Sequence, residues 1–364
     1  MHQESQNLDN SITNVLVVLR HDANYRPGGD TTLLSLLSRN LIDCKCTIQV
    51  GIPNNVKKFD VVICANIDRP IEANELLKVC QRDQVPLHLM SLHHSYSDIS
   101  KFLKYGLQGW KRVLALLSGF SPVIYEQFLW TLRVFVSYFS KAPILNFGNV
   151  SRSQLELLNG CELLLVVSKD EQKMIEHDIG SIHCRVAFVP HIIGEKPIEK
   201  CKEKNIIFCP GRVESRKNQL FLLEVAKYLQ EFNFVFMGRL NVSEPSYCKK
   251  FMKSISSLKN VSYLEPAELE DFRVYLMSSK IVLTSSWFEV TSLIELEVLK
   301  SGNKLVTGSP SYNNSFFSNP LVFENNDFDG CVMMIKKAFE ENDIKILGEY
   351  PDSNSIVKGY LDSI

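Results

Sequence analysis

The chain has 364 residues, which is more than one domain usually contains, so two domains with separate cores are expected. Hydrophobic residues make up 45% of the sequence and charged residues 22%, as in an ordinary globular protein. The formal net charge of −1 argues against nucleic-acid binding, which would need a basic excess, so any anionic ligand must be held by local charge.

The ten cysteines are scattered, and no Cys-x-x-Cys spacing indicates a zinc or redox site. They are typical of small core residues in a reducing compartment. Residues 1–14 are polar, and the apolar run 15–19 is too short for a signal-peptide core or a membrane span. We therefore expect a cytoplasmic protein.

Strand-like apolar runs alternate with helical ones along the chain, which predicts an α/β fold with two doubly wound, Rossmann-like parallel sheets. The strands expected in the first half are 15–19, 47–50, 61–64, 87–92, 163–167 and 186–189. Those expected in the second half are 206–209, 234–237, 261–264, 281–284, 305–307 and 321–323. Between the halves, 191–204 is rich in Lys, Glu and Pro, as an interdomain hinge would be.

A glycine pair follows the first predicted strand. Gly28 and Gly29 precede a predicted helix 31–37, with Asp30 or Thr31 as its N-cap. Without Cβ atoms, the glycines would let backbone amides approach an anionic ligand such as a diphosphate. The pattern is not the G-x-G-x-x-G of dinucleotide-binding proteins, and such a pair before a helix is also common turn chemistry.

Segment 101–147 breaks the alternation, because it is rich in aromatic residues and carries six Lys and Arg residues against the single acid Glu126. Polar residues interrupt each apolar stretch before it reaches membrane-spanning length. One interpretation is a segment that contacts an anionic membrane surface. The alternative is a packed helical insert that covers the first sheet.

In the second half, residues 206–219 predict a strand, a tight turn and a loop that leads into a helix 220–229. Gly211 permits the turn, and Arg212 and Lys217 place two positive charges at the C-terminal end of the strand. Open parallel sheets bind ligands at that end, so the two cations are a candidate pyrophosphate clamp. The alternative is that they only solvate a loop.

Two carboxylates, Glu289 and Glu297, flank the start of a predicted helix near Ser292. Eight residues at helical rise span roughly 12 Å, which is about the distance from a donor sugar to the ribose of its nucleotide. The helical projection places Glu297 within the apolar face and Glu295 away from it. A buried Glu needs a partner, which is either a ligand or, in the alternative interpretation, a backbone amide.

The motifs at 206–219 and 285–297, about seventy residues apart, resemble the C-terminal half of retaining glycosyltransferases of family 4, which have the two-domain GT-B fold. Segments 27–31, 59–70 and 287–289 resemble a bacterial subgroup that builds surface polysaccharides such as O-antigen. The resemblance covers nearly the whole chain. It implies four parts: an N-terminal acceptor-side domain (1–192), a hinge (193–204), a nucleotide-sugar-binding domain (205–345) and a tail that packs back on the first domain (346–364).

The resemblance implies retaining transfer of a hexose from a UDP- or GDP-sugar to a hydroxyl of a glycan or lipid-linked glycan. The catalytic residues it implies are Arg212 and Lys217, which stabilise the departing diphosphate, and Glu289, which binds donor-sugar hydroxyls. The other implied donor contacts are the ribose ligand Glu297, the backbone at Gly211 and Leu264, the helix N-terminus at Thr291, Ser292 and Leu293, the segment Gly28, Gly29 and Asp30, and His93 or its neighbour His94.

No metal or other cofactor is expected, because the two cations suffice to neutralise the diphosphate. Asp327 and Asp329 are not interpreted as a metal motif, since two acids in a loop are too few ligands. Two other functions stay open from the sequence: a sugar-nucleotide epimerase of related fold, and a catalytically silent nucleotide-sugar-binding subunit of a transferase complex.

Overall fold

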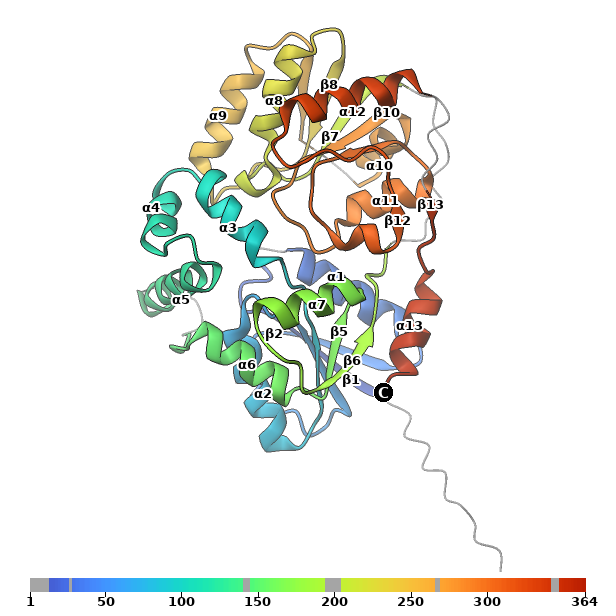
Figure 1. Ribbon diagram of the computed structural model, residues 1–364. Coiled ribbons are helices and arrows are strands. Elements are labelled where there is room, and N and C mark those ends of the chain that lie inside the picture. The colour runs from blue at the N-terminus through green and yellow to red at the C-terminus, as the bar shows by residue number, and fades with distance from the viewer. Residues whose placement is uncertain (1–12, 26–27, 140–144, 194–203, 266–268, 342–346) are drawn as a thin grey trace, which may run out of the picture.

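The computed structural model describes residues 13–25, 28–139, 145–193, 204–265, 269–341 and 347–364. Two parallel α/β units lie one above the other along the long axis of the molecule (Figure 1). The predicted α/β fold with two parallel sheets is confirmed. The predicted hinge 193–204 lies, apart from its two end residues, outside the described residues.

The first sheet has six parallel strands in the order β2-β1-β3-β4-β5-β6. They are β1 (Asn14–Leu19), β2 (Lys45–Val50), β3 (Val61–Ala65), β4 (Leu87–Met90), β5 (Leu163–Val166) and β6 (Arg185–Phe188). Inner strands such as β1 and β5 are continuous apolar runs because helices cover both faces of the sheet. The predicted strand 87–92 ends at Met90, since Leu92 has a left-handed φ of 50° that turns the chain.

The helices of this unit divide between the two faces of the first sheet. One face packs on α1 (Gly29–Asn40), and the other packs on α2 (Pro70–Asp83), α6 (Val150–Gly160) and α7 (Lys169–Asp178). Alternate residues of β1 follow this division: Val15 and Val17 belong to the core on the α1 side, and Leu16 and Val18 belong to the core on the α2 side.

The second sheet has five parallel strands in the order β11-β10-β7-β8-β9. They are β7 (Lys204–Pro210), β8 (Asn233–Met237), β9 (Val261–Leu264), β10 (Ser279–Thr284) and β11 (Leu305–Thr307). The predicted strand 321–323 is reduced to a single bridge between Thr307 and Val322. A separate antiparallel pair joins β12 (Phe317–Ser318) to β13 (Leu347–Gly348).

One face of the second sheet packs on α8 (Gln219–Tyr228), α9 (Pro245–Ile255) and α12 (Phe328–Glu340). The opposite side carries α10 (Leu269–Ser278) and α11 (Leu293–Ser301). Two short 3-10 helices, η1 (Ser215–Lys217) and η2 (Tyr312–Ser315), lie in loops of this unit.

The chain ends in α13 (Ser353–Leu361), which packs on α1 and β6 of the first unit (Figure 1). Tyr360 is 1% exposed, and its hydroxyl lies 2.8 Å from His88 Nδ1 on β4. Where the chain returns toward the first unit, the Tyr350 hydroxyl donates to the carbonyl oxygen of His191 at 2.7 Å. The segment before α13 is therefore bonded to the segment that follows β6.

Segment 101–147 is mostly helical where it is described. It contains most of α3 (Tyr96–Tyr105), together with α4 (Trp110–Leu117) and α5 (Pro122–Phe139). Trp130 of α5 is buried and donates through Nε1 to the carbonyl oxygen of Asn146 at 3.1 Å. Within the described part of the chain, no helix is both long and apolar enough to cross a membrane.

Candidate functional site

Two glycines shape the C-terminal edge of the second sheet. Gly211 has a φ of 130°, which residues with side chains rarely adopt, and it turns the chain directly after β7. A Cβ on Gly238, at the end of β8, would lie 2.0 Å from the carbonyl oxygen of Gly211. Gly238 N also donates to the carbonyl oxygen of Leu264 at 3.3 Å. The backbones of three adjacent loops therefore meet at this edge.

A compact ionic cluster lies beside this edge. The Glu289 carboxylate is 9% exposed and binds the ammonium group of Lys217 and, at 2.9 Å, the guanidinium of Arg216. Arg216 also donates to the carbonyl oxygen of Phe288 at 3.2 Å and lies 5.6 Å from the centre of the Phe288 ring. Burial alone would raise the pKa of Glu289, but the charges of Arg216 and Lys217 hold it well below its usual range. Glu289 is therefore ionised at neutral pH.

Arg212 is more exposed than Lys217 and is oriented by a buried acid. Its side chain is 44% exposed, and its Nε lies 2.9 Å from Glu214. Glu214 also accepts from Asn241 at 3.0 Å and lies 3.4 Å from Arg216. One carboxylate therefore organises two guanidinium groups, and the free edge of Arg212 remains accessible to solvent.

The N-terminus of α11 points to the same region. Ser292 is the N-cap, and its side chain accepts from the backbone N–H of Glu295. The Thr291 hydroxyl bonds Nδ1 of the buried His191, which follows β6 of the first unit. Burial lowers the pKa of His191 to about 3, so this contact is made by a neutral ring. Leu293 is the first residue of the helix and is half-buried.

The predicted orientation of Glu295 is wrong. Glu295 is 1% exposed and accepts from Thr284 at 2.7 Å, from Thr307 at 3.3 Å and from Asn313 at 3.2 Å. Burial, with a further contribution from the charge of Glu289, raises the pKa of Glu295 to about 7.

Glu297 is half-buried, and the nearby charge of Arg273 partly offsets the rise in its pKa that burial causes. The projection failed because α11 carries apolar residues on most of its surface, so the sequence does not define a single buried face. Whether Glu297 binds a ribose stays a prediction.

The glycine pair begins α1 earlier than predicted. Gly28 is the N-cap and α1 begins at Gly29, so neither Asp30 nor Thr31 caps the helix. Asp30 instead accepts from the Arg20 guanidinium at 2.5 and 3.2 Å and from Thr31 N at 2.8 Å. A Cβ on Gly28 would lie 2.7 Å from the Asp30 carboxylate, whereas Gly29 has open space around its Cβ position.

His93 and His94 have different environments. His93 is fully buried, with Nδ1 2.7 Å from Asp68 and Nε2 3.1 Å from Asp178. Burial would lower the pKa of His93, but the two carboxylates raise it to about 10. The side chain of His94 is 23% exposed, and its ring centre lies 5.0 Å from that of Phe288 in the second unit. Of the two histidines, His94 is the one placed beside the Glu289 loop.

Several of the predicted residues thus converge. Gly211, Lys217, Glu289 and the N-terminus of α11 lie at the ends of β7 and β10, between which the strand order reverses, and open α/β sheets bind ligands at such a point. Arg216 was not predicted, and only the position of Lys217 beside it in the sequence pointed to its location. Asp327, excluded as a metal ligand, is the N-cap of α12.

Neither a family model nor a curated protein sequence matches this chain. Solved structures are similar to it in fold. Sucrose-phosphate synthase from Thermosynechococcus elongatus has a TM-score of 0.64 at 9% identity, over 96% of this chain and 94% of that one. HepE from Anabaena, in complex with UDP, has a TM-score of 0.61 at 11% identity, over 97% and 94%. The lipopolysaccharide outer core galactosyltransferase WaaB has a TM-score of 0.57 at 12% identity, over 97% and 98%.

The chain has the GT-B fold. Because the match extends over nearly the full length of each of these proteins, both units belong to it. The ionic cluster at β7 and β10 therefore lies in the C-terminal GT-B unit, and His94 faces it from the N-terminal unit.

Proposed function

We propose that this protein is a retaining glycosyltransferase that moves a hexose from a UDP- or GDP-sugar to a hydroxyl of a glycan or lipid-linked glycan. The observation that carries the proposal is the partly buried cluster of Lys217, Arg216 and Glu289 beside the N-terminus of α11. In support, HepE was solved in complex with UDP, and also with UDP and glucose. A UDP-sugar is accordingly the preferred donor.

The cations match the charge that develops on the leaving group. As the glycosidic bond to the diphosphate breaks, negative charge accumulates on the phosphate oxygens. Lys217 and the exposed edge of Arg212 would bind that charge, and the α11 N-terminus would add its positive dipole end. Because these groups are fixed by Glu214 and Glu289 before the donor binds, little reorganisation is needed in the transition state.

The Glu289 carboxylate would bind the sugar of the donor. Glu289 is ionised and can therefore only accept hydrogen bonds, which suits sugar hydroxyl groups. Retention of the anomeric configuration would follow from attack on the face that the diphosphate leaves, with a phosphate oxygen accepting the acceptor's proton. This mechanism needs no side-chain base and no metal ion.

Thermal denaturation with UDP, GDP, dTDP and ADP and their sugars tests the donor site. At a hundredfold excess over Kd, a ligand stabilises the fold by about 2.7 kcal/mol, which shifts Tm by several degrees. We expect a shift for one base that is lost in Lys217→Ala and kept in the exposed control Lys227→Ala. No shift with any nucleotide would refute the proposal. Release of free diphosphate only when a glycan acceptor is supplied would separate a transferase from an epimerase and from a silent subunit.

The helices α4 and α5 support a peripheral membrane location at the inner face of the plasma membrane. Their exposed apolar side chains include Trp110, Val113, Leu116, Leu117, Ile124, Leu132, Phe135, Val136, Tyr138 and Phe139. Three of the expected cations are engaged, because Lys101 binds Asp98, Lys111 binds Glu244 and Arg133 binds Glu126, and Lys141 lies outside the described residues. We therefore expect apolar insertion to contribute more than charge to binding.

Flotation with vesicles tests this location. The full chain should float with vesicles of phosphatidylcholine and phosphatidylglycerol, and a Leu117→Ser, Phe139→Ser double variant should not. Retention of flotation in the variant would argue against this surface as the attachment site.

A further inference from the structure

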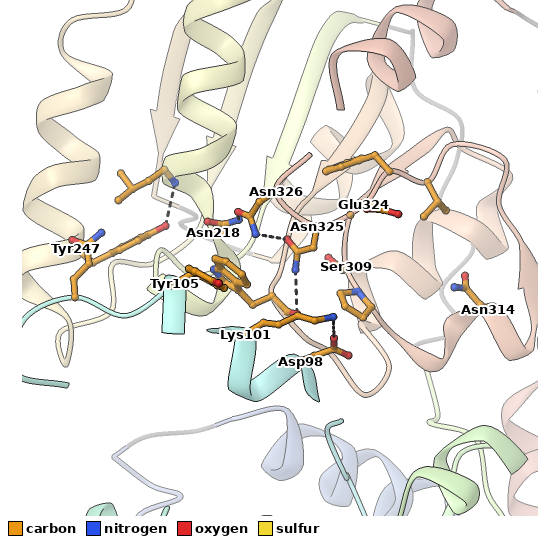
Figure 2. Close-up of a pocket in the computed structure, with 18 residues that line it drawn as sticks. Asp98, Lys101, Tyr105, Asn218, Tyr247, Ser309, Asn314, Glu324, Asn325 and Asn326 are labelled. Atoms are coloured by element: carbon orange, nitrogen blue, oxygen red, sulfur yellow. Dashed lines mark hydrogen bonds and ion pairs between the residues drawn. The ribbon is translucent and has the colours of Figure 1, made fainter. Parts of the chain in front are cut away.

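A cavity of about 940 Å³ lies between α3 and loops of the C-terminal unit. In Figure 2, Asp98, Lys101 and Tyr105 approach it from α3, and Asn218 and Asn325 approach it from the opposite side. Both GT-B units therefore contribute to its wall. Cavities of about 300–1,000 Å³ hold ligands larger than a single monosaccharide.

This cavity is separate from the candidate donor site. Lys217 and Ser286 line a small cavity at the ends of β7 and β10, whereas the next residues along the chain, Asn218 and Trp287, line the large one. Segment 285–287 therefore forms a wall between the two. Asn325 fixes this wall by donating to the carbonyl oxygens of Ser286 and Trp287, each at 3.2 Å.

The lining of the large cavity suits an uncharged polyol. Among its described lining residues the only basic side chain is Lys101, which lies 3.2 Å from Asp98, and Glu324 adds a further negative charge. A phosphate would find no unpaired cation among these lining residues. Carboxamides can both donate and accept, and aromatic rings offer flat apolar faces. Both kinds are present: Gln108, Asn218, Asn314, Asn325, Asn326, Tyr105, Tyr247 and Trp287.

We infer that this cavity binds a neutral oligosaccharide segment of the acceptor glycan, at units distant from the hydroxyl that receives the sugar. The inference rests on the proposed transferase function and adds a second glycan subsite to it. Tyr105 is its most accessible aromatic side chain, with 63% of its surface exposed. A glycan there would touch α3 and the loop that carries Trp287 together, and so would hold the two GT-B units against each other.

The test uses the labelled full chain on a printed array of neutral and acidic oligosaccharides of two to ten units. The tightest neutral oligosaccharide is then titrated against Tyr105→Ala, Asn314→Ala and the control Tyr228→Ala, whose side chain is 61% exposed on α8. We expect at least tenfold weaker binding in the first variant, a smaller loss in the second and no change in the control. The Tm shift given by the nucleotide should be unchanged in all three.

Each other result overturns the inference. Unchanged glycan binding in both Tyr105→Ala and Asn314→Ala would place the glycan elsewhere. Binding of acidic oligosaccharides alone, or of none, would reject the neutral ligand. Because the nucleotide shift is measured on the same samples, a protein that keeps that shift but fails these tests loses only the glycan subsite. A protein without the nucleotide shift loses the proposed function itself.

Discussion

Replacing Glu295 by Gln should stabilise the protein above neutral pH. The pKa of this buried carboxyl is raised from its ordinary 4.5 to about 7, so the folded state binds a proton that the unfolded chain has released between these values. Stability therefore falls as pH rises from about 4.5 to about 7. From the shift of the pKa, the cost of ionising Glu295 grows by roughly 2–3 kcal/mol between pH 5 and pH 8.

Gln keeps the shape of Glu295 and still accepts from Asn313 through its carbonyl oxygen, and the hydroxyls of Thr284 and Thr307 can rotate to accept from its amide. We expect the Tm of Glu295→Gln relative to wild type to rise by about 3–4 °C from pH 5 to pH 8. Glu231→Gln, at an exposed position, serves as the control and should show no such trend. A difference that stays constant or shrinks with pH would refute the assignment of a proton to Glu295.

Three further perturbations test contacts outside the donor site. Lys111→Met should lower the free energy of unfolding by about 1–2 kcal/mol, because the 2.8 Å ion pair between Lys111 and Glu244 is only partly exposed. A double-mutant cycle with Glu244→Gln should show the coupling between the two side chains, and losses of stability that simply add would contradict this. His93→Gln should destabilise most below pH 6.5 and progressively less as pH rises toward 10, because the contribution of charged His93 is lost as its raised pKa is passed; pH-resolved melting curves measure this, and a constant loss would count against a charged ring. Tyr360→Phe should lower the free energy of unfolding, measured by urea denaturation, by about 1–2 kcal/mol, because it leaves His88 without its hydrogen-bond partner. An unchanged urea midpoint would show that this hydrogen bond does not stabilise the fold.

The sheets were predictable because their inner strands are buried on both faces and appear in the sequence as short apolar runs between turns. The position of Lys217 at a sheet edge followed from the strand before it and from Gly211. These features depend on residues that are close together in the sequence, and local patterns record them well.

The wrong orientation predicted for Glu295 has a different origin. Glu295 is buried because Thr284, Thr307 and Asn313, which lie on three separate elements, satisfy its carboxylate. His93 is enclosed in the same way by carboxylates 25 and 85 residues away in the chain. Partners so far apart in sequence leave no periodic signal, and for this reason the sequence could not distinguish a satisfied buried charge from a ligand.

The bond between Tyr350 and His191 bears on how the two GT-B units can move. The chain passes from one unit to the other after β6 and returns before α13, so two covalent connections join the units. The bond between Tyr350 and His191 joins these two connections. A single connection would let the units rotate relative to each other about all three axes. Two connections that are bonded to each other leave chiefly one rotation of the units, about the line that passes through both connections. Such a rotation would separate His94 of the N-terminal unit from Phe288 of the C-terminal unit, whose ring centres lie 5.0 Å apart in this structure.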